Sequence, residues 1–283
     1  RLTALGMRPI NNVVDVSNYV MLELGQPSHT YDLAALARGG GTGPALRVRR
    51  AVEDETVETL DGVVRTLSAS DGVIADGDDA AIGIAGIMGG ASTEISGETT
   101  SVVLEMAWWD PQTISTSSRR LGLRSEASIR FERGADPEVA DLAMRRFAEL
   151  LSDSGATLAP GTIDVRGRVP DRSPVRVRTG RVNALLGTDL SRDEMADLLE
   201  PIGFTSEPAY GDPSSADLDV AVPCFRPDSA TEIDVVEEVA RMHGYGRIAR
   251  TVPSSTITGS LTPYQQDRRS VRDAMVGLGL DEV

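Results

Sequence analysis

Short apolar runs separated by turn residues dominate the first 110 residues, and this pattern predicts strands. Asp-Gly pairs at 61–62 and 76–77 lie between such runs, where Asp-Gly signals a β-hairpin. A strand is also expected to begin at 47–49, after a surface loop formed by the glycines of 39–43. The apolar run at 102–104 predicts a further, buried strand. We therefore expect the first part of the chain to be rich in strands.

Helical periodicity becomes clear after residue 135. An apolar stripe predicts a helix that stops at Gly155, with Asp136 as its N-cap and Pro137 at its first position. The stripe consists of Val139, Leu142, Ala143, Phe147, Leu150 and Leu151. Packing alone explains this helix, so it indicates no function.

A stretch containing proline and arginine at 165–174 predicts a domain boundary. Periodicity and capping residues then predict a new set of short elements. These are helices at 181–186, from the Ser191 and Glu194 capping box to Pro201, and from Thr231 to Gly244, with a strand at 218–222.

The fold class that follows is α+β. A strand-rich mixed α/β domain is predicted at 1–165, and a small winged-helix-like domain with three helices at 174–249. Residues 250–283 are predicted to form a linker and the start of a further helical module, Thr262 to Leu278, that is cut off. Because the chain opens on arginine inside a motif, we expect it to be an internal piece of a longer protein.

Composition narrows the classes of function. Arginine supplies all 28 basic residues, against 43 acidic ones, so the net charge is −15. A chain that binds nucleic acid by itself usually carries a basic face, so we expect no DNA binding and only local contact with RNA. No apolar run is long enough to cross a membrane, and a single cysteine, Cys224, excludes an internal disulfide and suits the cytoplasm.

The stretch GMRPINNVVDVSNYVMLELGQPSHTYD at 6–32 carries more polar residues than a core needs. Its amides, hydroxyls and histidine alternate with valines in what reads as a buried strand or a short helix, so each polar group needs a partner or a ligand. Two interpretations stay open from these residues alone. The polar groups either join a loop to its neighbours or line a binding site.

Glu105 interrupts an apolar strand in the segment SVVLEMAWWDP. A carboxylate between Leu104 and Met106 must be paired or must serve a ligand, because burying an unpaired charge is costly. The simplest partner is one of the nearby arginines, Arg119, Arg120 or Arg124. Upstream, the spacing in IGIAGIMGG fits neither a phosphate-binding loop nor a dinucleotide fingerprint. Its glycines allow close approach of either a ligand or another strand.

Acidic residues gather in the segment VPCFRPDSATEIDVVEEVARMHGYG. Asp234, Glu237 and Glu238 share one face of the predicted helix, and Asp228 in the entering turn can fold back over it. Four carboxylates with no lysine to pair with suit a hard cation such as Mg²⁺. The alternative is that Asp228 or Thr231 caps the helix and that acidic residues in its first turn favour its positive dipole end.

Three blocks of the sequence resemble, in order, the beta subunit of bacterial phenylalanyl-tRNA synthetase. The 6–32 stretch and the block IAGIMGG…VVLEMAWWDP…LRSEASIRFERGADP resemble the editing domain of that family, and the acidic segment resembles the small domain that follows it. Together they span nearly the whole chain. Gly246 departs from the pattern, since the family usually has Asp there, but this does not touch the acidic set.

The resemblance implies that residues 1–165 are a tRNA-editing domain that hydrolyses the ester of tyrosyl-tRNA(Phe). It implies that Glu105 accepts a hydrogen bond from the phenol of the substrate, with Ala127 leaving room for the ring and Gly86 lining the pocket. The ester end and a hydrolytic water would be held by His29, Ser17, Asn18 and Ser125. Both serines stand where the family has threonine, so each keeps the hydroxyl and loses a methyl group.

For the small domain the resemblance implies Mg²⁺ bound by Asp228, Asp234, Glu237 and Glu238. It further implies a cytoplasmic ligase of two alpha and two beta subunits, in which the alpha subunit binds ATP and charges tRNA(Phe) with phenylalanine. This chain would then contribute proofreading and assembly. Two other functions stay open, a non-hydrolytic module that binds tRNA or a partner and an acidic scaffold that docks a subunit.

Overall fold

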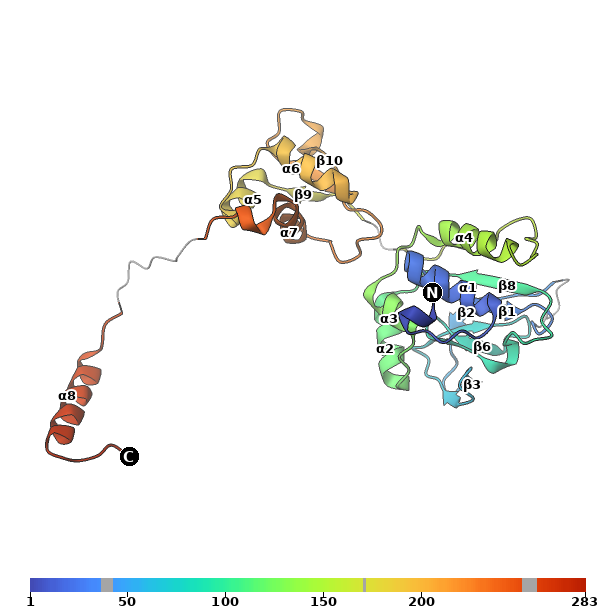
Figure 1. Ribbon diagram of the computed structural model, residues 1–283, viewed down its shortest axis with the longest axis horizontal. Helices are drawn as coiled ribbons and strands as arrows, with labels where there is room; N and C mark the ends of the chain where they lie inside the picture. Colours follow the sequence, from blue (N-terminus) through green and yellow to red (C-terminus); the bar gives the residue numbers. More distant parts are fainter. Residues whose placement is uncertain (37–42, 170–171, 251–258) are drawn as a thin grey trace. The chain divides into compact units, whose positions relative to one another are not determined.

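The computed structural model describes residues 1–36, 43–169, 172–250 and 259–283. These residues form two compact units, Arg1–His243 and Gly244–Val283. Antiparallel sheets and α-helices occur together in the first unit, which confirms the predicted α+β class (Figure 1). The glycine loop predicted at 39–43 lies mostly outside the described residues.

A two-stranded antiparallel ribbon, β1 (Ser28–Asp32) and β8 (Val102–Met106), lies at the centre of the part that precedes residue 156 (Figure 1). Successive strand side chains point to opposite faces, so the ribbon has two different faces. One packs on helices α1 (Asn12–Leu24) and α4 (Ala140–Ser152), which contact each other. Leu104 and Met106 of β8 join the apolar cluster on this side.

The other face of the ribbon meets a four-stranded antiparallel sheet. Its strands, in spatial order, are β2 (Arg47–Arg50), β5 (Gly72–Ala75), β6 (Ala81–Ile84) and β7 (Met88–Gly89). Tyr31 of β1 packs with Ile74 and Ile82 of this sheet. The Asp-Gly pair at 76–77 lies in the loop between β5 and β6, which confirms the predicted hairpin.

The second predicted hairpin is also confirmed, because β3 (Thr56–Glu58) and β4 (Val64–Thr66) pair across the Asp-Gly turn at 61–62. Helices α2 (Pro111–Leu121) and α3 (Glu126–Arg133) follow β8. Ile114 of α2 and Phe131 of α3 belong to the largest apolar cluster of this part, together with Val73 of β5. The apolar core between these helices and the sheet therefore holds α3 against the sheet.

The start of α4 differs from the prediction. The helix begins at Ala140, and its N-cap Val139 makes no side-chain capping bond. Asp136 instead accepts a hydrogen bond from the backbone N–H of Glu138, 2.9 Å away, in a separate turn. A short side chain that bonds two residues ahead stabilises a turn rather than a helix, so the periodic pattern overestimated the helix by one turn.

Residues 172–243 have their own apolar core. Its elements are β9 (Val175–Val177), α5 (Thr179–Leu186), α6 (Arg192–Leu199), β10 (Thr205–Pro208), β11 (Leu218–Ala221) and α7 (Glu232–His243). The predicted capping box of Ser191 and Glu194 is present. Strand β10 was not predicted, because its sequence TSEP shows no apolar alternation; it extends the sheet to the order β10-β11-β9.

The second unit contains α8 (Pro263–Gly277), whose N-cap Thr262 forms a capping box with Gln265, near the predicted bounds. Short 3₁₀ turns complete the structure at Thr3–Leu5, Ala91–Thr93, Glu200–Ile202, Ala209–Gly211 and Tyr245–Arg247. Within the described part of the chain, no helix combines the length and apolarity that a membrane crossing requires.

Candidate functional site

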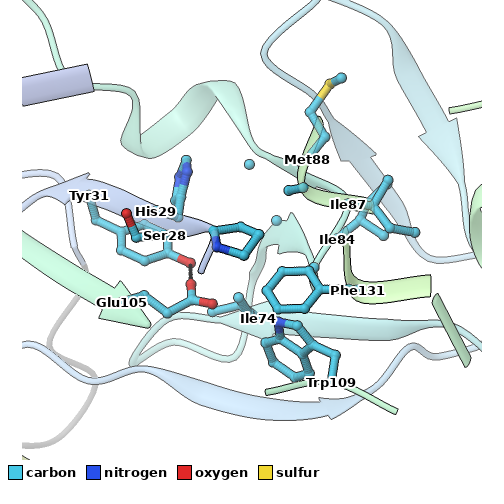
Figure 2. A pocket seen from close by; sticks show the side chains of 15 residues that line it. Ser28, His29, Tyr31, Ile74, Ile84, Ile87, Met88, Glu105, Trp109 and Phe131 are labelled. Atoms are coloured by element: carbon cyan, nitrogen blue, oxygen red, sulfur yellow. Dashed lines mark hydrogen bonds between the residues drawn. The ribbon is translucent and has the colours of Figure 1, made fainter. Parts of the chain in front are cut away.

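A cavity of about 70 Å³ lies between the β1–β8 ribbon and the β6–β7 end of the sheet (Figure 2). The titratable side chains that line it are His29, Tyr31 and Glu105. Its apolar wall consists of Ile74, Ile84, Ile87, Met88, Trp109 and Phe131. Two ring-bearing side chains opposite a carboxylate suit a ligand that has an aromatic ring and a polar tip.

Glu105 lies on β8, and within the described structure it accepts no hydrogen bond from an arginine. Among the described residues its side-chain hydrogen bond is with Tyr31, whose hydroxyl donates to Oε2 (Figure 2). Burial raises the pKa of the Glu105 carboxyl to about 7, although the bond from Tyr31 acts in the opposite direction. The prediction that an arginine pairs with Glu105 is therefore wrong. Arg120 pairs with Asp71 and Arg124 with Glu132.

His29 lies directly opposite Glu105 in the antiparallel register of β1 and β8. Its ring stands edge-on to Tyr31, with 4.6 Å between ring centroids and an angle of 79° between planes. Its Nε2 is buried and has no hydrogen-bond partner within the described structure. Burial lowers the pKa of His29 to about 4, so the imidazole is neutral at neutral pH.

Glycines of the IGIAGIMGG segment let other parts of the chain approach closely, and one of these approaches is to a neighbouring strand. At Gly89 a Cβ would lie 2.5 Å from Nε2 of His29, so only glycine lets the imidazole rest against β7. At Gly90 a Cβ would lie 2.5 Å from the carbonyl oxygen of Ile82, which is an approach of backbone to backbone. Gly86 lines the cavity as predicted, with φ of +68°.

The size of the cavity bears on what it can hold. An engineered cavity of about 150 Å³ in another protein admits benzene. At about 70 Å³ the present cavity is smaller, so a phenol ring enters only when side chains of its wall move outward. Ala127 on α3 lines the cavity with a single methyl group, which is consistent with the predicted space for a ring.

The structure does not bring Ser17, Asn18 or Ser125 to the wall of this cavity. The Ser17 hydroxyl lies 2.8 Å from that of Ser28 and joins α1 to β1. The Ser125 hydroxyl caps α3 and donates to the Ile87 carbonyl at 2.6 Å. These hydroxyls hold the walls in place, while His29, Glu105, Gly86 and Ala127 line the cavity itself.

Sequence reasoning missed Tyr31, Trp109 and Phe131. A signal for Tyr31 was present, because residues two apart in a strand share a face and Tyr31 follows His29 by two. Trp109 and Phe131 carried no such signal, since their positions depend on how the chain after β8 packs on the sheet.

The predicted acidic set is not assembled as a metal site. No group of three or more candidate ligands comes together in the regions that the structure describes. Arg226 bonds Asp228 at 2.9 Å and Glu238 at 2.7 Å, and it lowers the pKa of both carboxyls. Asp234 accepts bonds from the N–H groups of Ala230 and Thr231.

These carboxylates therefore do not fit a cation in this arrangement. Asp234 stabilises the start of α7, as the alternative expected of acidic residues in the first turn, and it accepts hydrogen bonds from the N–H and the hydroxyl of Thr231. Asp228, the other cap that the alternative named, instead pairs with Arg226. Glu237 is exposed. The absence of lysine left the sequence without an obvious basic partner, but arginine supplies one through Arg226 and Arg241.

Comparison with known protein families finds a match for each of the two parts of the chain. A family model described as the B3/4 domain matches residues 1–156, and one described as the tRNA synthetase B5 domain matches residues 175–245. These matches lie inside the predicted domains 1–165 and 174–249, whose limits stay predictions.

Curated relatives are called phenylalanine–tRNA ligase beta subunit. The chain is 45% identical over 288 residues to that of Geobacter sulfurreducens, and 45% identical over 284 residues to that of Cutibacterium acnes, covering 100% of this chain each time. It spans about a third of the length of these relatives, 34% and 32%. An N-terminal fragment of the phenylalanyl-tRNA synthetase beta subunit from Pyrococcus horikoshii matches with a TM-score of 0.39 and 15% identity, covering 82% of this chain and 65% of that one.

The first part of the chain thus carries a B3/4 domain, and the second part carries a tRNA synthetase B5 domain. The chain belongs to the B3/4-domain family, and it is similar to about a third of the length of phenylalanine–tRNA ligase beta subunits.

Proposed function

We propose that the cavity hydrolyses the ester of tyrosyl-tRNA(Phe) and spares phenylalanyl-tRNA(Phe). The observation that carries this proposal is a buried carboxylate, Glu105, in a cavity whose wall is mostly apolar and includes Trp109 and Phe131. A pocket that selects phenylalanine cannot strongly reject a ring that only adds a hydroxyl, so a second site is needed to sort by that hydroxyl. A buried carboxylate favours binding of the ring that carries a hydroxyl, because it accepts a hydrogen bond from that hydroxyl.

His29 serves this reaction as a group that positions water or the ester. Its neutral ring with a pKa of about 4 accepts protons weakly at neutral pH, so it is a poor general base. Its unpartnered Nε2 still offers one hydrogen bond inside the cavity. Water then adds to the ester carbonyl carbon, the bond to the ribose oxygen breaks, and tyrosine and uncharged tRNA leave.

The wider assembly is part of the same proposal. We place this chain in a cytoplasmic ligase with an alpha partner, with two copies of each subunit, in which the alpha subunit binds ATP and attaches phenylalanine to tRNA(Phe). The net charge of −15 argues that tRNA contact comes mainly from the partner or from other parts of the full-length subunit. No step of the hydrolysis described here uses Mg²⁺.

The test uses the full-length subunit assembled with its alpha partner. Release of tyrosine from mischarged tyrosyl-tRNA(Phe) is compared between wild type and Glu105→Ala, with phenylalanyl-tRNA(Phe) as the control substrate. We expect rapid tyrosine release by the wild type, loss of that release in the variant, and little release of phenylalanine by either. No release by the wild type would mean that the domain only binds tRNA or a partner.

A further inference from the structure

Tyr31 is a buried tyrosine that the proposed reaction does not yet use. Its side chain is only 1% exposed, and its hydroxyl donates to Oε2 of Glu105. Its ring lies against the imidazole of His29. Because β1 and β8 are paired in register, Tyr31 contacts both of the other titratable side chains of the cavity, His29 and Glu105.

The carboxylate of Glu105 has more capacity than Tyr31 uses. A carboxylate has two oxygens and about four lone-pair sites. Tyr31 bonds to one oxygen, and Figure 2 shows the other pointing toward the wall that contains Phe131. Among the residues that line the cavity, the titratable groups facing this carboxylate are Tyr31 and His29, and His29 is neutral.

We propose that Tyr31 is a positioning residue for tyrosine recognition, which holds one oxygen of Glu105 so that the other is presented to the phenol of the substrate. This inference rests on the proposed function. A phenol that donates to a carboxylate fixes its rotation and favours its ionised form, which accepts hydrogen bonds more strongly. Tyr31 therefore prepares Glu105 for the same kind of bond that the substrate makes.

The experiment compares Tyr31→Phe with wild type in the full-length subunit assembled with its alpha partner. The variant keeps the ring and removes only the hydroxyl. We expect the ratio of kcat/KM for tyrosyl-tRNA(Phe) to that for phenylalanyl-tRNA(Phe) to fall by about tenfold, the scale of a charge-assisted hydrogen bond. We also expect the rise of tyrosine release with pH to move to higher pH, since Glu105 loses the bond that favours its ionised form.

A double-mutant cycle separates positioning from a general loss of structure. If Tyr31 acts through Glu105, Tyr31→Phe has little further effect in a Glu105→Gln background. Tyr245→Phe is the matched control, because Tyr245 is 59% exposed and lies outside the cavity, and it leaves the ratio unchanged. Thermal unfolding of each variant reports whether the fold is retained.

Two failures are distinguishable. If the wild type releases no tyrosine, the proposed function is wrong. If the wild type releases tyrosine and Glu105→Gln lowers the release, while Tyr31→Phe keeps both the substrate ratio and the pH profile, the role of Tyr31 is overturned. Equal losses from Tyr31→Phe in the wild-type and Glu105→Gln backgrounds would overturn it as well.

Discussion

His29 and Glu105 lie directly opposite each other on β1 and β8, although 76 positions separate them in the sequence. In an antiparallel pair, opposite residues point to the same face, so the register alone brings the imidazole and the carboxylate to one cavity. Both side chains lose water there, and burial moves their pKa values toward the neutral form of each, to about 4 and about 7.

Replacement of His29 tests its part in hydrolysis. We expect His29→Asn to lower kcat for tyrosine release by about a hundredfold, because the variant loses the Nε2 that positions water or the ester. The other histidine, His243, lies at the end of α7, and His243→Asn serves as the control with near-normal release. Single-turnover hydrolysis of tyrosyl-tRNA(Phe) makes the comparison. Equal rates for the two variants would show that His29 has no part in the hydrolysis.

Gly89 tests the packing of the imidazole. A methyl group added at this position meets the ring of His29 at 2.3 to 2.5 Å, so Gly89→Ala must displace the ring from the cavity. We expect a fall in tyrosine release close to that of His29→Asn. Gly97→Ala is the matched control, because a Cβ there meets nothing within 4 Å. Normal release by Gly89→Ala would show that the position of His29 against β7 is unimportant.

Discrimination between tyrosine and phenylalanine should depend on pH through Glu105. Its pKa is about 7, so the fraction of ionised carboxylate rises as pH increases from 6 to 8. We expect the preference for tyrosyl-tRNA(Phe) to increase over this range, because the ionised carboxylate is the stronger acceptor. Glu105→Gln should flatten the profile. An unchanged slope in this variant would assign the titration to another group.

Stability should depend on pH through His29. Its folded-state pKa of about 4 is below the ordinary value of 6.5, so its contribution to stability is present above pH 6.5 and is lost as pH falls toward 4. A shift of this size corresponds to at most about 3 kcal/mol. Denaturant unfolding of wild type and His29→Asn between pH 4 and 7 should show the steeper loss in the wild type. Parallel curves would contradict the burial of an uncharged imidazole.

We expect the stability of residues 172–243 not to depend on a metal ion, because Arg226 pairs with the carboxylates that would bind it. Glu238 is buried but keeps Arg241 as a second partner, so Arg226→Gln should destabilise the fold by about 2 kcal/mol, the scale of one hydrogen bond to a charged group. Chelation by EDTA should leave the wild-type unfolding temperature unchanged, while Mg²⁺ should partly restore the variant. Arg272→Gln, in an exposed pair with Asp273, is the control. A drop in the wild-type unfolding temperature on chelation would restore the carboxylates as a metal site.

Turns and helix ends could be read from the sequence because each depends on residues next to it. Asp-Gly pairs specified two hairpins, and the Ser191–Glu194 capping box marked the start of α6. The same local logic misplaced the start of α4, where Asp136 stabilises a turn within its own neighbourhood. Four residues that the family resemblance indicated line the cavity, namely His29, Gly86, Glu105 and Ala127.

The tertiary structure alone decided which polar groups meet across long distances. Tyr31 and Glu105 bond because β1 and β8 pair in one register, and a shift of one residue would place the two side chains on opposite faces of the ribbon. Arg226 takes up two of the carboxylates that the sequence offered to a cation, since charged side chains select partners by distance in the folded chain. These distances cannot be predicted from composition and periodicity, because many different folds are compatible with the same apolar pattern.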